Sequence, residues 1–260
     1  MKTVILCGGL GTRLSEETVI KPKPMVEIGD MPMLWHIMNL YSKYNYQDFY
    51  LTLGYKGEVI KDFFINYQSK LSDIKVNLAD GCIEILNRHT ENWIVNLIDT
   101  GQSTLTGGRI LRLRKFLDDG DDLFFATYGD GLANININRL LSFHKQHNKI
   151  ATVTAVRPVA RFGNLEIDRG MVSSFKEKTQ SSEGWINGGF FVFSKKIFDY
   201  LEDDETVLEQ SPLERLVSEN QLMAYKHDGY WQCMDTVRDR DILRKYFETG
   251  NPPWLNNHES

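Results

Sequence analysis

Cysteine and long apolar runs are both scarce in this chain. Its 260 residues include three cysteines, Cys7, Cys82 and Cys233, which are far apart and odd in number. They provide neither a disulfide framework nor a Cys-x-x-Cys metal site, as is usual in a reducing compartment. No stretch approaches the ~20 apolar residues that a membrane-spanning helix needs, and the first apolar run is too short for a signal peptide. We therefore expect a soluble cytoplasmic protein without a membrane partner.

An excess of positive charge is also absent. The 30 lysines and arginines are outnumbered by 35 acidic residues, which gives a net charge of -5 and a pI near 5.7. This balance argues against binding a nucleic acid through its phosphate backbone. The one cation-rich stretch, residues 109–117, is typical of a helix with a solvated face. The chain is nevertheless long enough, and apolar enough, to bury a full globular core.

Up to about residue 160, short apolar runs alternate with amphipathic segments. The pattern predicts strands and helices in turn, with strands at 3–7, 48–55, 93–100, 122–130 and 150–156 and helices at 32–44, 58–67, 107–117 and 138–147. Such alternation is typical of an α/β fold, here a Rossmann-like mixed, mostly parallel sheet flanked by helices.

After residue 160 the pattern changes to closely spaced strands, which predicts a smaller β-rich C-terminal portion. Strands are expected at 163–168, 172–178 and 188–193, a strand pair at 222–227 and 230–236, and helices near 195–201, 212–219 and 237–250. No linker or internal repeat interrupts the chain, so we expect a single domain over 1–260.

A glycine-rich turn follows the first predicted strand, in "VILCGGLGTRL" (4–14). Glycines at such a turn let backbone N–H groups approach phosphate oxygens without a Cβ in the way. The string G-x-x-x-x-G-K-[ST] of a P-loop does not occur. The dinucleotide fingerprint G-x-G-x-x-G begins at Gly9 and Gly11, but Leu14 replaces its third glycine. The turn therefore predicts a phosphate cradle of another kind.

Two cations close to this turn strengthen the interpretation. Arg13 can direct its forked guanidinium at phosphate oxygens, and Lys23 provides a point charge between Pro22 and Pro24. The two prolines exclude a helix interior and keep the segment extended. The alternative is an ordinary glycine turn followed by exposed cations, and the residues alone favour phosphate binding over it.

These residues resemble a known signature. The string G-G-x-G-T-R-L followed by K-P-K-P-M-V-E-I-G is similar to that of the sugar-phosphate nucleotidylyltransferase superfamily. The segments "TGQSTLTGGR", "TYGDG", "RFGNLEID", "INGGFFVF" and "WQCMDTVRD" follow in the order of one branch, the glucose-1-phosphate cytidylyltransferases. The resemblance covers essentially the whole chain. It implies transfer of the cytidylyl group of CTP to α-D-glucose 1-phosphate, which gives CDP-glucose for deoxysugars of surface polysaccharide.

The resemblance also implies Mg²⁺ as cofactor and a homo-oligomer, a hexamer in this branch. A nucleotide-binding half (1–157) would be followed by a sugar-phosphate-binding and oligomerisation half (158–260). Implied catalytic residues are Arg13, Lys23 and Asp130. Implied nucleotide-binding residues are Leu6, Cys7, Gly8, Gly9, Leu10, Gly11, Thr12, Arg13, Lys23, Thr104, Gly107, Arg109 and Asp130. The sugar phosphate would meet Glu177, Lys178, Asn187 and Gly188.

Asp130 and Asp235 each end an apolar run that is expected to be a strand. Parallel strands bring their carboxyl ends to one edge of a sheet, and Mg²⁺ is commonly held there by one or two carboxylates and substrate phosphates. The alternative is that each aspartate only caps a turn. The resemblance implies that both are metal ligands, so we expect them to share one ion.

Several alternatives stay open at this point. Glu177 and Lys178 could be a solvated charge pair on a hairpin, with a β-bulge at Gly188–Gly189. A nucleotide-sensing module would keep the glycine turn without needing Lys178 or both aspartates, and a dehydrogenase would need the missing glycine. A thymidylyl- or uridylyltransferase is the nearest rival, since it differs in its base contacts, which we place in 100–109.

Overall fold

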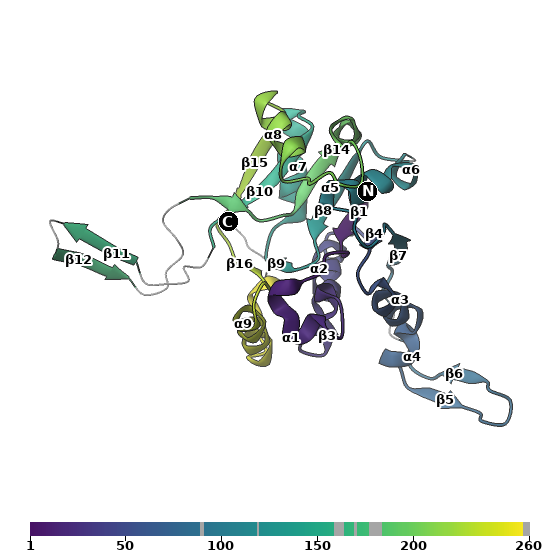
Figure 1. Cartoon of the computed structure of the whole chain (residues 1–260). Helices are drawn as coiled ribbons and strands as arrows, with labels where there is room; N and C mark the ends of the chain where they lie inside the picture. The colour runs from purple at the N-terminus through teal and green to yellow at the C-terminus, as the bar shows by residue number, and fades with distance from the viewer. Residues whose placement is uncertain (89–90, 119, 159–163, 169–170, 177–183, 257–260) are drawn as a thin grey trace.

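An eight-stranded mixed sheet forms the centre of the molecule in the computed structural model (Figure 1). The structure describes residues 1–256 apart from 89–90, 119, 159–163, 169–170 and 177–183. Of residues 13, 15, 164–168 and 172–176 it describes the backbone alone. In the described chain no helix combines the length and the apolar character that crossing a membrane requires.

The sheet is built from one parallel set of strands and a shorter antiparallel set. Its strands are β1 (Lys2–Leu6), β4 (Asp48–Leu53), β7 (Ile94–Asp99), β8 (Leu123–Tyr128), β10 (Ala151–Val156), β13 (Ile186–Asn187), β14 (Phe191–Ser194) and β15 (Leu222–His227). The order β8-β1-β4-β7 is parallel throughout, and β15 lies parallel to β10. β14 runs antiparallel between β8 and β10, and β13 pairs with the far end of β10. The predicted mostly parallel, mixed sheet is confirmed.

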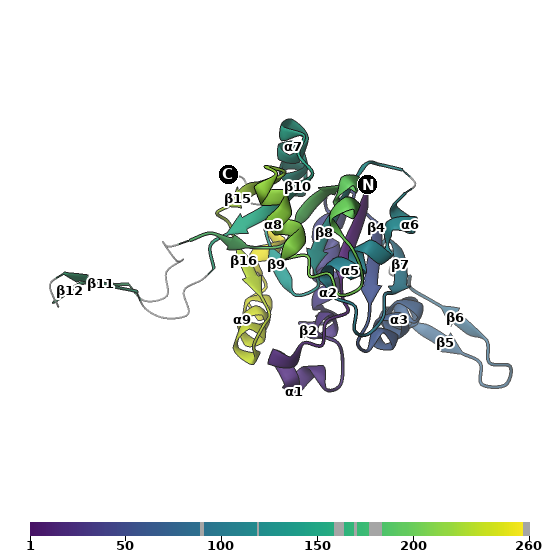
Figure 2. The same cartoon turned by 45° about the horizontal axis from the view of Figure 1, so that its top comes forward.

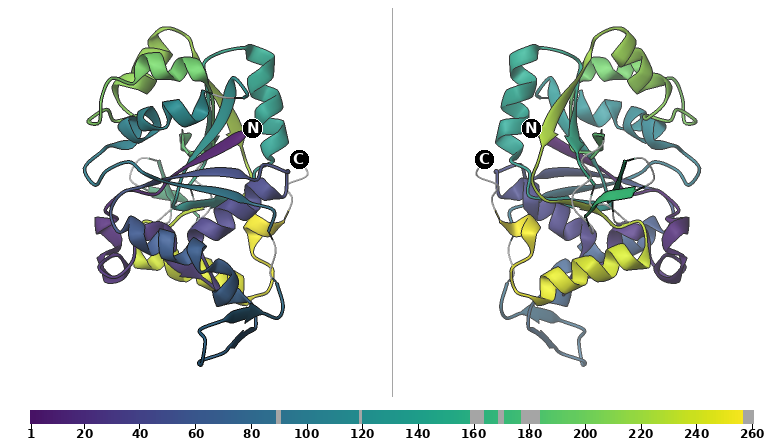
Figure 3. Two further views of the ribbon diagram at one scale, coloured as in Figure 1. Left: turned by 90° about the vertical axis from the view of Figure 1, so that its right-hand side faces the viewer. Right: turned by 90° about the vertical axis from the view of Figure 1, so that its left-hand side faces the viewer.

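Helices cover both faces of this sheet, as the two side views show (Figure 3). The helices of the described chain are α1 (Ser15–Thr18), α2 (Met33–Ser42), α3 (Gly57–Ile65), α4 (Tyr67–Leu71), α5 (Thr106–Arg112), α6 (Arg114–Leu117), α7 (Ile137–His147), α8 (Ser211–Ser218) and α9 (Val237–Glu248). Alternate strand residues enter two cores: Ile5 and Phe125 pack with α2, α7 and α9, whereas Val4 and Phe124 pack with α5, α6 and α8. Both faces are therefore buried, as a parallel sheet requires.

Among the described residues, four short ladders lie outside the sheet. They are β2 (Glu27–Ile28) with β3 (Met31–Pro32), β5 (Ile74–Val76) with β6 (Ile83–Ile85), β9 (Gly131–Ala133) with β16 (Trp231–Cys233), and β11 (Asn164–Asp168) with β12 (Met171–Lys176). The β5–β6 and β11–β12 hairpins project from the body in both views (Figures 1 and 2). Short 3-10 helices complete the described chain at Thr12–Leu14, Lys23–Met25, Lys195–Tyr200 and Pro253–Leu255.

Two sequence-based expectations are wrong. The strands at 222–227 and 230–236 do not pair with each other, because β15 joins the main sheet beside β10 whereas β16 pairs with β9. The cation-rich segment 109–117 is not one solvated helix. It comprises the end of α5 and the short α6, and Arg109 is buried, with 4% of its surface exposed.

Candidate active site

A cavity of about 470 Å³ opens at the carboxyl edge of the parallel strands. After β1 the chain moves outward through β4 to β7 and then returns to β8 on the other side of β1. The strand order therefore reverses between β1 and β8, which is the place where open α/β sheets bind ligands. The cavity is lined by residues 6–12, 23–24, 102–106, 109 and 128–130.

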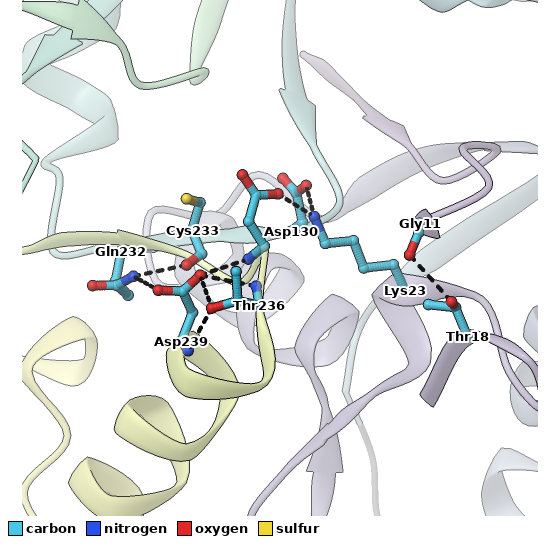
Figure 4. Close-up of polar contacts among 9 residues, drawn as sticks. Gly11, Thr18, Lys23, Asp130, Gln232, Cys233, Thr236 and Asp239 are labelled. Atoms are coloured by element: carbon cyan, nitrogen blue, oxygen red, sulfur yellow. Dashed lines mark hydrogen bonds and ion pairs between the residues drawn. The ribbon is translucent and has the colours of Figure 1, made fainter. Parts of the chain in front are cut away.

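The glycine turn forms one wall of this cavity, and two of its glycines are required by the local structure. Gly11 has a φ of +63°, in the left-handed region that favours glycine. Its carbonyl accepts hydrogen bonds from Leu14 N and from Thr18 Oγ1, at 3.0 and 3.1 Å (Figure 4). A Cβ on Gly8 would lie 2.1 Å from the guanidinium of Arg109, so a larger residue there would displace that guanidinium.

Hydrogen bonds from Arg109 connect the glycine turn to the ends of the neighbouring strands. Its guanidinium donates to the carbonyl of Gly8 at 3.0 Å and to that of Leu53, at the end of β4, at 3.1 Å. Beyond the end of β7 it donates to Thr100 Oγ1 and to the carbonyls of Gly101 and Gln102, at 2.7, 2.8 and 3.2 Å. One buried cation thus satisfies acceptors from three loops and fixes the shape of the cavity wall.

Lys23 lies next to Gly11 of the glycine turn, and its ammonium lies between two carboxylates. Its Nζ is 2.7 Å from Oδ2 of Asp130 and 2.6 Å from Oδ1 of Asp235. Pro22 and Pro24 flank it at the start of a 3-10 helix, which holds its backbone in place. The two aspartates were expected to meet at this edge of the sheet, and both indeed contact the same ammonium.

The strand before Asp235 is paired differently from what was expected. Asp130 follows β8 of the main parallel sheet, but Asp235 follows β16, which pairs antiparallel with β9 outside that sheet. Met234 N donates to the carbonyl of Asp130 at 2.8 Å, so the small ladder places the two aspartates side by side. The next residues begin α9 with a capping box between Thr236 and Asp239.

Electrostatics at this triad favour a positive charge. Burial alone would lower the pKa of Lys23, but the charge of Asp130 and hydrogen bonds to both carboxylates outweigh it, so the pKa lies above its usual value. The side chains of Lys23, Asp235 and Asp130 are 11%, 16% and 30% exposed, so solvent screens them weakly.

The same donor set fits a hard divalent cation. The described residues contain no group of three or more His, Cys, Asp or Glu side chains suited to a metal ion. Two convergent carboxylates are nevertheless the usual protein share of a site that substrate phosphates complete. The ammonium of Lys23 occupies the position between them, which shows that the site accepts positive charge. These residues are therefore compatible with a divalent metal ion.

Of the other residues predicted to bind substrate, Thr104 lines the cavity, whereas Gly107, Asn187 and Gly188 do not. Thr104 is buried in the cavity wall, whereas the N–H of Gly107 donates to Thr206 O, with which the glycine is closely packed. Asn187 donates to the hydroxyl of Tyr128 at 3.1 Å, and the carbonyl of Gly188 accepts from Trp231 Nε1 at 2.9 Å.

Three predicted residues cannot be placed in this way. Glu177 and Lys178 lie outside the described residues, and Arg13 is described in its backbone alone, within the 3-10 helix Thr12–Leu14. Cys7 lines the cavity, but burial raises the pKa of its thiol far above the usual value, so it is not a thiolate at neutral pH.

Tyr128 is a lining residue that the sequence analysis missed. Its hydroxyl donates to Oε1 of Glu209 at 2.5 Å and accepts from Asn187, so it connects the cavity to the strand that carries the predicted sugar contacts. Burial and the charge of Glu209 raise its pKa, which keeps the phenol protonated. The signal was present in the sequence, since this tyrosine lies two residues before Asp130.

Known proteins share both the sequence and the fold of this chain. The family model described as nucleotidyl transferase matches residues 2–239. The chain is 49% identical over 254 residues to the glucose-1-phosphate cytidylyltransferase of Salmonella typhi, with 98% of each chain covered. It is 45% identical over 255 residues to the probable glucose-1-phosphate cytidylyltransferase of Bacillus subtilis (strain 168), with 98% of this chain and 99% of that protein covered.

Among solved structures, the chain resembles HddC from Yersinia pseudotuberculosis complexed with GMP-PN. The TM-score is 0.69 at 25% sequence identity, and the likeness covers 95% of this chain and 99% of the other.

Proposed function

The chain belongs to the nucleotidyl transferase family, within the branch of the glucose-1-phosphate cytidylyltransferases, and we propose that it transfers the cytidylyl group of CTP to α-D-glucose 1-phosphate. The products are CDP-glucose and pyrophosphate. The observation that carries the proposal is the position of Lys23 between Asp130 and Asp235, at the mouth of a cavity whose wall is the glycine turn.

The reaction needs no general base. A phosphate monoester has a second pKa near ~6, so the attacking oxygen of glucose 1-phosphate is already largely deprotonated at neutral pH. In agreement with this, the residues that line the cavity in the described chain include no histidine. The enzyme must instead bring two polyanions together and stabilise the charge of the transferred and leaving groups.

The residues around the cavity meet these two requirements. The N–H groups of the turn 8–11 can approach phosphate oxygens closely because its glycines carry no Cβ. Lys23 adds an ammonium beside them, and we assign Arg13 a forked contact to the same phosphates. The two terminal nitrogens of Arg109 already donate to four carbonyls and one hydroxyl, so this residue keeps the cradle in shape, and with Thr104 it bounds the space that we assign to the cytosine base.

We assign Mg²⁺ as the divalent ion, held by Asp130 and Asp235. Two carboxylates with substrate phosphates suit Mg²⁺, which binds oxygen ligands and keeps part of its water shell. When bound, it neutralises phosphate charge and so reduces the repulsion between the two substrates. With Mg²⁺ held by Asp130 and Asp235, the ammonium of Lys23 would be free to contact the triphosphate.

The sugar phosphate occupies the side of the cavity beside β13. We assign Lys178 to its phosphate and Glu177 to a sugar hydroxyl, with Asn187 and Gly188 lining the hexose pocket. The hydrogen bond between Asn187 and Tyr128 supports this placement, because it ties β13 to a residue that lines the cavity.

The proposal includes a single domain with a nucleotide half (1–157) and a sugar-phosphate half (158–260), assembled as a homo-oligomer, a hexamer. A thymidylyl- or uridylyltransferase acting on the same sugar phosphate is the alternative, since every phosphate contact would be unchanged. The identities of 49% and 45% to glucose-1-phosphate cytidylyltransferases favour the cytidylyl reaction.

A ³¹P NMR assay tests this function. The full chain is incubated with CTP, glucose 1-phosphate and MgCl₂, and the diphosphate signals of CDP-glucose are followed together with those of pyrophosphate. We expect both products in equal amounts. No reaction with CTP, or release of pyrophosphate without CDP-glucose, would contradict the proposal.

A further inference from the structure

A second cavity, of about 740 Å³, lies at the opposite edge of the sheet from the active site. It is lined by Leu123, where β8 begins, by Ile150 and Gln221, which precede β10 and β15, and by Ser194, where β14 ends. In Figure 1 this edge lies toward α7 and α8, whereas the active-site edge lies toward α1 and α9. The volume is in the range of small-molecule sites.

A chain of hydrogen bonds fixes the tautomers of two histidines beside this cavity. The N–H of Lys149 donates to Nδ1 of His147 at 3.0 Å, so the ring proton of His147 lies on Nε2. That nitrogen donates to Thr152 Oγ1 at 2.8 Å. The hydroxyl proton of Thr152 then goes to Nδ1 of His144, 2.9 Å away. His144 therefore carries its own proton on Nε2.

The series of hydrogen bonds ends at the Nε2–H of His144, which donates to none of the groups in it. His144 is 98% buried and lines the cavity, and it has no further hydrogen-bond partner among the described residues. Burial, and then the charge of His147, lower its pKa to about 4, so the ring is neutral at physiological pH. Nε2 of His144 is not one of the fully buried unpaired atoms of the described residues, so it reaches the cavity and offers an N–H donor there.

The charged residues around this donor are mainly cations. Lys145, Lys149, Lys195 and Lys196 line the cavity together with two acids, Asp122 and Glu219. Lys195 is held by the carbonyl of Asp118 at 2.8 Å, and Glu219 accepts from the hydroxyl of Tyr200. Within the described residues, the ammonium groups of Lys145, Lys149 and Lys196 form no salt bridge, although the protein as a whole has a net charge of -5.

We propose that this cavity is a second ligand site, separate from the active site, that binds a phosphate group through the Nε2–H of His144 and the ammonium groups of Lys149 and Lys196. Phosphate oxygens are acceptors with negative charge, and therefore match a neutral donor surrounded by lysines. The cavity is larger than a phosphate ion, so the ligand can be free phosphate or a phosphate ester such as a nucleotide. This site goes beyond the proposed function and does not depend on it.

The test uses the imidazole nitrogen signals of His144 in the ¹⁵N-labelled full chain, which report on this cavity and not on the active site. Inorganic phosphate, CMP and glucose 6-phosphate are titrated separately. We expect a saturable shift of Nε2 of His144 with at least one of them. The probe with the lowest Kd shows whether free phosphate or a phosphate ester is preferred.

The paired variant Lys149→Ala/Lys196→Ala should weaken this binding by roughly tenfold or more, because two charge-assisted contacts are lost. Lys115→Ala removes an exposed lysine of α6 and should leave the Kd unchanged. The proposal is overturned if none of the probes shifts His144, or if the paired variant binds as the wild type does. The transferase assay described above is read separately, so failure of one proposal is distinguishable from failure of the other.

Discussion

The ammonium of Lys23 lies 2.6 Å from Oδ1 of Asp235, although 212 residues separate them in the sequence. The contact exists because β9 and β16 pair beside the end of β8, which brings the start of α9 to the glycine turn. Through this contact, the C-terminal part of the chain contributes a carboxylate to the active site.

Replacing either aspartate by asparagine should abolish most turnover while the fold persists. Asp130→Asn and Asp235→Asn keep the size of the side chain but remove one negative charge from the proposed metal site. We expect turnover to fall by roughly 100-fold or more, as when one electrostatic contact to reacting charge is lost. Turnover is measured against Mg²⁺ concentration, and added Mg²⁺ should recover only part of the loss.

The matched control for these variants is Asp241→Asn, in the same helix as the capping box. Asp241 is exposed, and its partner Arg240 also pairs with Glu17, so this change should leave turnover unaltered. If Asp235→Asn has the turnover and Mg²⁺ dependence of the wild type, Asp235 is a turn cap and not a metal ligand.

Lys23→Ala should weaken CTP binding. A charge-assisted contact to a phosphate contributes about 1.5–3 kcal/mol, so we expect the Kd measured by calorimetry to rise roughly 10- to 100-fold. Lys21→Ala is the control, because Lys21 is a nearby lysine that pairs with Glu27 instead. Equal CTP affinities for the two variants would remove Lys23 from the nucleotide site.

Arg109→Lys should destabilise the protein, despite keeping the charge. A single ammonium cannot reach five acceptors spread over three loops, so buried carbonyls lose their donor. We expect a loss of roughly 3 kcal/mol in the free energy of unfolding, measured with urea. Arg112→Lys, one turn further along the sequence in an exposed pair with Asp204, should cost less than about 1 kcal/mol. Similar losses for both would show that the loop contacts of Arg109 contribute little.

Stability should fall in mild acid through His144. Burial lowers its pKa from 6.5 to about 4 in the folded chain, so the unfolded chain takes up the proton first. Above pH 6.5 His144 is neutral in both states and does not reduce the free energy of unfolding. As the pH falls from 6.5 to about 4, the free energy of unfolding decreases by up to about 1.4 kcal/mol per pH unit. Urea unfolding of the wild type and of His144→Gln measures it. The variant should show a shallower slope in this window, and an identical slope would contradict the assignment.

The active-site edge could be foreseen largely because its signals are local. Gly8, Gly9 and Gly11 directly follow a strand, and the residue after a strand end lies at the sheet edge whatever else the chain does. Asp130 follows the same logic. Asp235 does lie beside Asp130, but an antiparallel ladder outside the sheet holds it there instead of a parallel strand, and no local pattern specifies that pairing.

The role of Arg109 and the pairing of β15 depend on contacts between segments that are distant in the sequence. Arg109 looked like one cation of a solvated helix, because its acceptors come from loops up to 101 residues away. The β5–β6 hairpin was missed although Asp80-Gly81 is a hairpin turn signal, and Gly81 indeed has a φ of +75°. The pairing expected between 222–227 and 230–236 is replaced by a six-residue parallel ladder of β15 with β10, a contact between distant segments that no local pattern specifies.

A competition experiment tests the central claim most directly. The enzyme receives equal concentrations of CTP, UTP, dTTP, ATP and GTP with glucose 1-phosphate and MgCl₂, and the nucleotide sugars formed at early times are quantified by mass spectrometry. Their ratio gives the ratio of kcat/KM values at equal substrate concentrations. The account predicts that CDP-glucose is the main product. A tenfold excess of dTDP-glucose or UDP-glucose over CDP-glucose would contradict it.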